Sequence, residues 1–180
     1  MKLIILDRDG VINEDSDEYI KTPDEFIPIP GSLEAITRLN HAGYTVLVAT
    51  NQSGIARGLF SMDALNQIHD KLKRLLNAYG GHIDGIFFCP HGPEDNCHCR
   101  KPKPGLYEEI AHRLKTDLDD VPAVGDSLRD LQAANLVGAT PVLVRTGKGE
   151  RTFAKGEGLK GIPVFPDLAA FVNQLLEGQQ

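Results

Sequence analysis

The stretch Leu3-Ile4-Ile5-Leu6-Asp7-Arg8-Asp9-Gly10 decides how the rest of the chain is interpreted. Its first four residues form a short, unbroken apolar run, which is typical of a strand that is buried on both faces of a sheet. The run changes abruptly into charged residues, so we expect the strand to end at Asp7 and two carboxylates to follow its tip. Such a strand predicts a ligand site at the edge of a parallel sheet.

An apolar run that stops at a polar or charged position recurs four more times along the chain, so five strands are predicted. The carboxyl ends of parallel strands share one edge of a sheet, and the residues that follow the runs should therefore gather there. The four further runs are Val46–Ala49 before Thr50, Gly85–Phe88 before Cys89, Ala123–Val124 before Gly125-Asp126, and Val142–Val144 before Arg145.

Segments with helical periodicity separate these strands. Ser and Thr side chains cap helix N-termini, and Pro is favoured in the first turn. Each of them therefore predicts a helix start where a helical apolar pattern follows it. The predicted helices begin after Ser32, after Ser61 and at Pro104, and two more cover Leu128 to Leu136, closing near Gly138, and Leu168 to Leu176.

Strands alternating with helices predict an α/β fold, a doubly wound, Rossmann-like parallel sheet with helices on both faces. We expect residues 1–180 to form a single domain, because the chain is long enough for one core and too short for two domains of ordinary size. No insertion is large enough to form a cap domain over the site. Residues 147–161 are interpreted as a loose surface excursion.

The composition excludes several classes of protein. Hydrophobic residues make up 41% of the chain and charged residues 24%, which is the balance of a soluble globular protein. The net charge of -6 argues against a nucleic-acid partner, since nucleic-acid phosphates require a basic surface. No apolar stretch approaches the ~20 residues that span a bilayer, so no membrane partner is expected. A small anionic substrate remains compatible with these numbers.

Three carboxylates at predicted strand ends indicate a magnesium site. Asp7 and Asp9 are two residues apart, and like charges this close are unfavourable unless a cation neutralises them. Mg²⁺ prefers oxygen ligands, including one or two carboxylates, and Asp126 at another strand end is a third candidate. In the alternative interpretation Asp7 and Asp9 merely end a strand and begin a turn at Gly10.

A second metal site is predicted from cysteines and histidines. Cys89, His91, Cys97 and Cys99 supply three thiolates and one imidazole, a closed tetrahedral set typical of structural zinc. His98 is an alternative fourth ligand, and an alternative without metal treats Cys89 as a buried residue at a strand end. Three cysteines confined to so short a segment are poorly placed for disulfides, so we expect a reducing, cytoplasmic location.

The strand ends together resemble the four motifs of the haloacid dehalogenase superfamily of phosphatases, namely Asp7–Asn13, Thr50, Lys101-Pro102-Lys103-Pro104 and Gly125–Asp130. The resemblance implies that Asp7 is the nucleophile and forms an aspartyl-phosphate, and that Asp9 protonates the leaving group and then activates water.

The same resemblance implies that Thr50 and Lys101 stabilise the phosphoryl oxygens, with Lys103 as a competing candidate for the cation. Mg²⁺ would be held by Asp7, by Asp126 and by the backbone carbonyl of Asp9 alone, which leaves the Asp9 side chain free for proton transfer.

Nearly the whole chain is similar to the D-glycero-D-manno-heptose-1,7-bisphosphate 7-phosphatase family, on the residues Asp7–Asn13, Thr50–Gly58 and Cys97–Pro102. The resemblance implies removal of the 7-phosphate of a heptose bisphosphate on the route to nucleotide-activated heptose for surface polysaccharide. It implies substrate contacts from Arg100 to the distal phosphate, and from Asn51, Ser53 and the loop Asp15 to Tyr19 to the sugar. Arg100 is alternatively an exposed charge.

Ser127 is a further candidate for substrate binding, although it stands where a lysine often follows the aspartate of the fourth motif. The partner is therefore expected to be a sugar bisphosphate, with Mg²⁺ and Zn²⁺ as cofactors and a monomer as the active form. Two alternatives are histidinol-phosphate phosphatase and a zinc-stabilised binding module of the same fold without catalysis. A phosphatase of nucleic-acid ends is disfavoured by the acidic charge. The anomer preference is left open.

Overall fold

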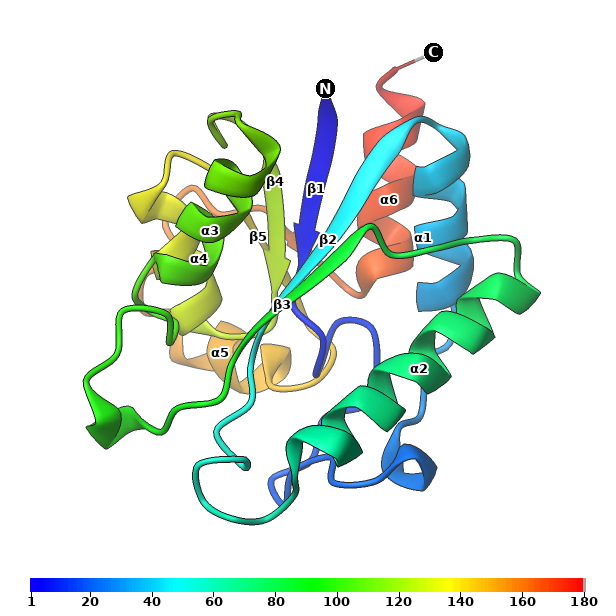
Figure 1. The fold of residues 1–180 in the computed structure, drawn as a ribbon. Helices are drawn as coiled ribbons and strands as arrows, with labels where there is room; N and C mark the ends of the chain where they lie inside the picture. The colour runs from blue at the N-terminus through cyan, green and yellow to red at the C-terminus, as the bar shows by residue number, and fades with distance from the viewer. Residues whose placement is uncertain (180) are drawn as a thin grey trace.

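Six parallel strands form one sheet in the computed structural model, which describes residues 1–179. The strands are β1 (Lys2–Leu6), β2 (Tyr44–Asn51), β3 (Gly85–Cys89), β4 (Pro122–Gly125), β5 (Thr140–Val144) and β6 (Val164–Phe165). Their order is β3-β2-β1-β4-β5-β6, and each neighbouring pair is parallel. The strand arrows point toward one end of the molecule, while the N-terminus and the end of the last helix lie at the other (Figure 1).

The central strand β1 is buried on both faces, as its apolar run predicts. Ile4 and Leu6 belong to one hydrophobic cluster, and Leu3 and Ile5 belong to the other. Successive side chains of a strand point to opposite faces of the sheet, so one unbroken apolar run serves both clusters. The predicted doubly wound α/β fold is confirmed.

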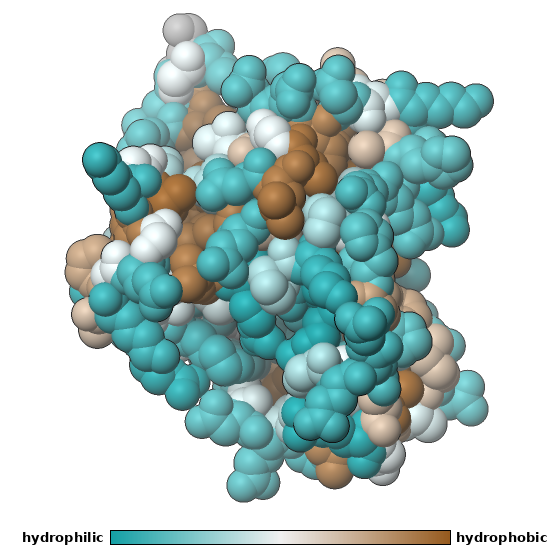
Figure 2. Space-filling model, turned by 90° about the vertical axis from the view of Figure 1, so that its left-hand side faces the viewer, coloured by the Kyte–Doolittle hydropathy of each residue, from teal (hydrophilic) through white to brown (hydrophobic). Residues whose placement is uncertain are grey.

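Helices cover both faces of this sheet. Helices α1, α2 and α6 contribute to the cluster that contains Ile4, whereas α3 and α4 contribute to the cluster that contains Ile5. Hydrophilic residues dominate the face of the molecule shown in Figure 2, with apolar residues gathered in its upper half. The helices are α1 (Ser32–His41), α2 (Met62–Ala78), α3 (Gly105–Leu114), α4 (Leu128–Leu136), α5 (Gly149–Lys155) and α6 (Leu168–Glu177), with short 3₁₀ turns η1 (Pro23–Glu25) and η2 (Pro93–Asp95).

Two of the three predicted helix starts are confirmed. The Ser61 hydroxyl accepts a hydrogen bond from the Ala64 amide at 3.1 Å, and Pro104 directly precedes α3. The prediction that Ser32 caps α1 is wrong, because Gly31 holds the cap position at a φ of 87°. The Ser32 hydroxyl instead donates to the carbonyl of Val11 at 2.9 Å and so ties α1 to the loop after β1.

The segment 147–161 is more regular than predicted. Helix α5 lies inside it, so the expected lack of regular structure is wrong, whereas its expected place on the surface agrees with the exposure of most of its residues. Seven residues make only two helical turns, which is too short for a clear apolar period. The two-residue strand β6 was not predicted for the same reason.

The strand order reverses between β1 and β4. The chain passes from β1 outward to β2 and β3 and then returns to β4 on the other side of β1. In open parallel sheets, ligands bind beyond the carboxyl ends of the strands at this reversal. Asp7 follows β1 and Asp126 follows β4, so the topology brings these two predicted residues together. No helix in the described part of the chain is long and apolar enough to cross a membrane.

Candidate active site and metal centres

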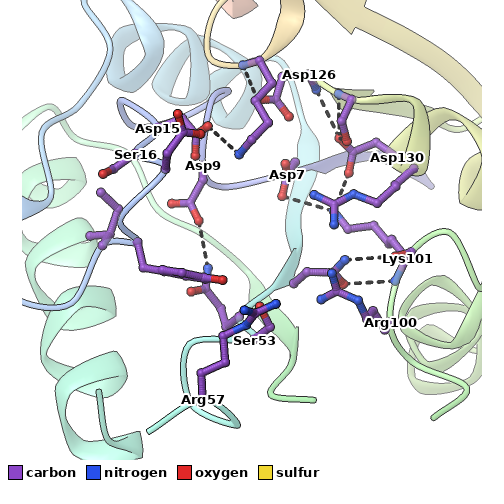
Figure 3. Close-up of a pocket in the computed structure, with 18 residues that line it drawn as sticks. Asp7, Asp9, Asp15, Ser16, Ser53, Arg57, Arg100, Lys101, Asp126 and Asp130 are labelled. Atoms are coloured by element: carbon purple, nitrogen blue, oxygen red, sulfur yellow. Dashed lines mark hydrogen bonds and ion pairs between the residues drawn. The ribbon is translucent and has the colours of Figure 1, made fainter. Parts of the chain in front are cut away.

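A pocket of about 310 Å³ opens at the reversal point, with charged side chains around it (Figure 3). Most of the residues that the sequence predicts to act in catalysis and substrate binding line this pocket. Thr50 is the exception: it is buried, does not line the pocket, and accepts a hydrogen bond from Gln52 at 3.0 Å. The predicted residues that line the pocket are Asp7, Asp9, Asp15, Tyr19, Asn51, Ser53, Arg100, Lys101, Asp126 and Ser127.

Three carboxylates meet at the floor of this pocket. Oxygen atoms of Asp7, Asp126 and Asp130 lie within 4.8 Å of one another. Burial and the charge of Asp130 raise the pKa of Asp7 to about 7, although Lys101 acts in the opposite direction. Burial, followed by the charges of Asp7 and Asp130, raises the pKa of Asp126 well above its ordinary range. This cluster carries more negative charge than its protein surroundings neutralise.

Lys101 supplies the one ammonium group that contacts this cluster among the described residues. Its Nζ donates to Asp130 Oδ1 at 2.6 Å, to the Ala49 carbonyl at 2.8 Å and to Asp7 Oδ1 at 3.1 Å. Burial alone would lower the pKa of Lys101, but Asp130 and Asp7 outweigh it and raise the pKa above its usual value. The structure thus brings Lys101 into the site.

Lys103, the competing candidate, lies outside the pocket. It is exposed, and its Nζ donates to the Cys97 carbonyl at 2.9 Å. Lys101 itself is held in place by Asn51. The Asn51 side chain donates to the Lys101 carbonyl at 3.1 Å and accepts from the Lys101 amide at 3.0 Å. Both polar atoms of this amide are therefore engaged by the backbone, so Asn51 positions Lys101, and a contact from Asn51 to the sugar stays a prediction.

Asp130 is the last residue of the fourth motif and has no predicted role of its own, yet it organises the site. Its Oδ2 accepts hydrogen bonds from the Ser127 hydroxyl and from the amides of Asp126 and Ser127, at 3.0 to 3.2 Å, and so caps α4. With Oδ1 bound to Lys101, all of these contacts keep Asp130 ionised and lower its pKa despite burial. Because both oxygens of Asp130 are already engaged, Asp7 and Asp126 are the carboxylates available to a metal.

Glycines allow the loops to approach Asp126 closely. Gly10 has a φ of 85°, and a β-carbon at this position would lie 2.0 Å from Asp126 Oδ2. Gly147 has a φ of 58°, and a β-carbon there would lie 2.4 Å from the same oxygen. The amide of Lys148 then donates to Asp126 Oδ2 at 2.8 Å. Only a backbone free of side chains at both positions permits this packing.

The carboxylate of Asp9 is held by four hydrogen bonds within the protein, and its expected role in proton transfer stays a prediction. Its Oδ1 accepts hydrogen bonds from Arg8 Nε at 3.0 Å, from Arg8 Nη2 at 2.8 Å and from Asn13 Nδ2 at 2.9 Å. Its Oδ2 accepts from Gln52 Nε2 at 3.1 Å. Burial would raise the pKa of Asp9, but Arg8 and these hydrogen bonds outweigh it and lower the pKa. These contacts arise because the side chain of Arg8, which stands between the two aspartates, is buried and turned toward Asp9.

The residues at the floor fit a magnesium ion. Two carboxylates with raised pKa values, Asp7 and Asp126, lie close enough to share one ion, and an added cation would relieve the excess charge. The third ligand expected from the resemblance is the backbone carbonyl of Asp9. The Asp9 side chain is directed to Arg8 and Gln52 instead, which is consistent with a contribution from the carbonyl alone.

The rim of the pocket is positively charged. Burial lowers the pKa of Arg100, and the neighbouring guanidinium groups of Arg129 and Arg57 lower it further, so three arginines crowd one side. Arg57 lies over the ring of Tyr19 at 5.8 Å. Arg57 and Arg129 were not nominated from the sequence, although both stand within the motif stretches, because a motif does not indicate which of its residues point inward.

Two ion pairs join the loop after β1 to the start of α5. Lys148 Nζ lies 2.7 Å from Asp15 Oδ2, and Arg151 lies 3.3 Å from Asp17. The loop after β1 is thereby linked to the start of α5. Lys148 is not among the predicted site residues, since residues 147–161 are interpreted from the sequence only as a surface excursion.

The cysteine loop brings three sulfur atoms together. Sγ of Cys89 lies 3.6 Å from that of Cys97 and 2.9 Å from that of Cys99. These separations are too long for a disulfide of about 2.05 Å and approach the spacing of about 3.8 Å between thiolates around a tetrahedral zinc. The cluster fits a zinc site, which these three cysteines would hold. His91 is exposed and lies outside the group of ligand atoms within 4.8 Å among the described residues, so its role as fourth ligand stays a prediction.

His98, the alternative fourth ligand, has a different neighbour. Its Nε2 lies 2.6 Å from Glu108 Oε2, and both side chains are exposed. Burial and Cys99 raise the pKa of the Cys89 thiol, and the backbone amide of His91 offsets only part of this rise. Burial would also raise the pKa of Cys97, but the backbone amide of Arg100 and the other two cysteines outweigh it and lower the pKa. Amides directed at sulfur favour the thiolate form that a metal requires.

Similarity to known proteins decides the family. Over 98% of its length the chain is 60% identical to the D-glycero-beta-D-manno-heptose-1,7-bisphosphate 7-phosphatase of Bordetella bronchiseptica, of which 99% is covered. The chain belongs to the D-glycero-D-manno-heptose-1,7-bisphosphate 7-phosphatase family. A heptose-bisphosphate 7-phosphatase from Pseudomonas putida is 55% identical over 98% of the chain and 100% of the relative. Residues 98–171 also match a family described as "HAD-hyrolase-like".

A solved structure from this heptose-bisphosphate phosphatase family agrees with the fold. The D,D-heptose 1,7-bisphosphate phosphatase of B. bronchiseptica superimposes with a TM-score of 0.97 at 60% identity, with 99% of each chain covered. That crystal structure is a complex with magnesium and phosphate.

Proposed function

We propose that the chain is a magnesium-dependent phosphatase that removes the 7-phosphate of D-glycero-D-manno-heptose 1,7-bisphosphate, in the biosynthesis of nucleotide-activated heptose. The observation that carries this proposal is the contact of Lys101 with Asp7 beside Asp126, beneath a rim of arginines. The relatives are named for the β anomer, and we extend that preference to this chain.

The first half-reaction transfers the phosphoryl group to Asp7. A carboxylate oxygen of Asp7 attacks phosphorus, and the bond from phosphorus to the sugar oxygen breaks. Asp9 gives its proton to that oxygen, so the sugar leaves as an alcohol. Lys101 Nζ, which already lies against Asp7, stabilises the negative charge on the phosphoryl oxygens.

The second half-reaction regenerates the free enzyme. Asp9, now ionised, takes a proton from a water molecule whose oxygen attacks the phosphorus of the aspartyl-phosphate. The bond between phosphorus and the Asp7 oxygen breaks, inorganic phosphate forms, and Asp9 is again protonated. When bound at Asp7, Asp126 and the Asp9 carbonyl, Mg²⁺ would neutralise charge and orient the phosphoryl group.

The arginine rim suits the second phosphate of the substrate. A guanidinium binds a phosphate through two parallel hydrogen bonds, which a lysine does not do. Arg100 is half-buried among other positive charges, and an anion placed there relieves their repulsion. Tyr19, Ser53 and Ser127 line the same pocket, and we assign them to the sugar.

We further propose that zinc at Cys89, Cys97, Cys99 and His91 is structural. Most residues between Cys89 and Cys97 are exposed and none has a large apolar side chain, so they bury little apolar surface with which to order themselves. Arg100 and Lys101 follow Cys99 directly, so an ordered loop fixes both of them. We also propose a monomer and a single domain, because one chain supplies all of these groups around one sheet. Light scattering and a single unfolding transition would check these two points.

The test is a phosphate-release assay with Mg²⁺ on three substrates, namely the β and α anomers of heptose 1,7-bisphosphate and histidinol phosphate. We expect turnover of the β anomer to exceed that of the other two. Faster hydrolysis of histidinol phosphate would favour that phosphatase class, and no hydrolysis of any ester would indicate a binding module. Asp7→Asn should keep its fold and lose turnover, because an amide is a poor nucleophile. Asp117→Asn, at an exposed aspartate outside the pocket, is the matched control.

A further inference from the structure

Arg8 is a fully buried cation, at 0% exposure, that does not line the pocket. It stands between Asp7 and Asp9, and its guanidinium turns away from the floor of the site. Nε and Nη2 donate to one oxygen of Asp9, at 3.0 and 2.8 Å. On its other side Nη1 lies 3.2 Å from Nε2 of His69, a residue of α2 that is 61 positions away in the chain. The ring of Phe26 lies 5.9 Å from the guanidinium.

The protonation of His69 follows from its surroundings. Burial and the positive charge of Arg8 lower the pKa of His69 to about 3, so its imidazole is neutral. A guanidinium carries donors only, and therefore Nε2 of His69 must be the acceptor and Nδ1 the nitrogen that holds hydrogen. His69 thus orients Arg8 without competing for the negative charge of Asp9.

This arrangement makes the two oxygens of Asp9 unequal. Oδ1 accepts three hydrogen bonds, two from Arg8 and one from Asn13, whereas Oδ2 accepts one from Gln52. Figure 3 shows Asp9 extending into the pocket, apart from Asp7. With Oδ1 held by three donors, Oδ2 is the oxygen left to exchange a proton with a substrate.

We propose that Arg8 and His69 form a buried positioning pair that fixes the rotamer of Asp9 and presents its Oδ2 to the leaving oxygen of the substrate. The pair rests on the proposed function, in which Asp9 is the acid and base. Proton transfer needs heavy atoms about 2.6 to 3.2 Å apart. A guanidinium fork anchored at both ends limits the motion of Asp9 more tightly than a single ammonium group does. His69 does not line the pocket, so it acts through Arg8.

The test compares two phosphate esters that differ in their need for an acid. The sugar oxygen of heptose bisphosphate is a poor leaving group and requires a proton, whereas the phenolate of p-nitrophenyl phosphate leaves without one. His69→Leu removes the acceptor for Arg8 at similar volume, and His69→Gln keeps an acceptor. The comparison uses kcat/KM, which reports only the first half-reaction, because the second half-reaction needs Asp9 as a base for either ester. With the Leu variant we expect kcat/KM on heptose bisphosphate to fall by roughly tenfold to a hundredfold, and kcat/KM on p-nitrophenyl phosphate by less than about threefold.

Three further comparisons make the test specific. His69→Gln should keep kcat/KM on both esters within about threefold of the unsubstituted protein. Arg8→Lys should show the same selective loss as His69→Leu. Leu72→Ala, a core substitution on the same helix, should lower stability and leave the ratio of the two rates unchanged.

Equal losses of kcat/KM on the two esters with His69→Leu, or no advantage of Gln over Leu, would overturn the positioning pair. Failure of the unsubstituted protein to hydrolyse heptose bisphosphate with Mg²⁺ would instead overturn the proposed function, and the inference would fall with it. The two failures are distinguished by the activity of the unsubstituted protein.

Discussion

Replacement of Lys101 by Met is the substitution whose outcome the structure specifies most fully. It removes an ammonium group that is 2% exposed and donates to Asp7, Asp130 and the Ala49 carbonyl. Breaking a buried ion pair by deleting one partner costs roughly 3–5 kcal/mol, because the remaining charge stays buried without compensation. For a domain of this size, 1 kcal/mol corresponds to a shift of about 2–4 °C, so Tm should fall by about 6–20 °C.

A second substitution separates stability from catalysis. Asp130→Asn in the Lys101→Met background removes one uncompensated charge and should restore roughly 1–2 kcal/mol of the free energy of unfolding. Turnover should not return, because no cation then faces the phosphoryl oxygens. We expect kcat to stay about a hundredfold to a thousandfold below that of the unsubstituted protein in both variants.

Urea unfolding in buffer without Mg²⁺ measures the free energy of unfolding of each variant, and phosphate release with Mg²⁺ measures kcat. Lys103→Met is the matched control, since Lys103 is exposed and its removal should change the free energy of unfolding by less than about 0.5 kcal/mol. The reasoning is refuted if the double variant is no more stable than Lys101→Met, or if Lys101→Met unfolds at the same urea concentration as the unsubstituted protein.

Three further predictions concern protons, zinc and the pocket wall. The pKa of Asp7 is raised from 3.8 to about 7 in the folded protein. Without Mg²⁺, the free energy of unfolding should therefore decrease as the pH rises from about 4 to about 7, because over this range Asp7 releases its proton in the unfolded chain but keeps it in the folded protein. Mg²⁺ affinity, measured by calorimetry, should rise with pH up to about 7, and a flat profile would contradict this. His91→Ala should lower the zinc content measured by mass spectrometry while His98→Ala preserves it, and the reverse would move the fourth ligand to His98. Lys148→Met breaks the contact with Asp15 and should raise KM by about fivefold with kcat within about twofold, whereas an unchanged KM would separate that ion pair from substrate binding.

The sequence predicts the fold well where apolar runs are long enough to carry a period. Five of the strands follow from runs such as Leu3–Leu6, because a strand buried on both faces needs no polar alternation. Strand β6 and helix α5 escape prediction, since two and seven residues do not establish a period. Ser32 has the residue type of a cap, but its hydroxyl binds Val11 instead, a contact that depends on tertiary structure.

The site is predicted in its residue types and less well in its hydrogen bonds. The motif residues follow the carboxyl ends of parallel strands, so the order and direction of the strands are enough to bring them close together. The hydrogen bonds of Asn51 with the Lys101 backbone, and those of Asp9 with Arg8, could not be predicted, because each depends on the direction of a side chain. His69 lies on a helix outside every motif, and its place beside Arg8 appears only when α2 packs on the sheet.

The strand order also determines which part of the site is most resistant to local opening. Asp7 follows the central strand β1, and its amide is bonded to Val124 of β4 at 2.9 Å, whereas Lys101 follows a loop that leaves the edge strand β3. Edge segments fray at lower free energy than central ones, so deuterium should enter the loop before it reaches the amides of β1. Fraying at that edge would withdraw the lysine and leave the paired aspartates in place. The two hydrogen bonds between the Asn51 side chain and the Lys101 backbone therefore join the part of the site that opens last to the part that opens first.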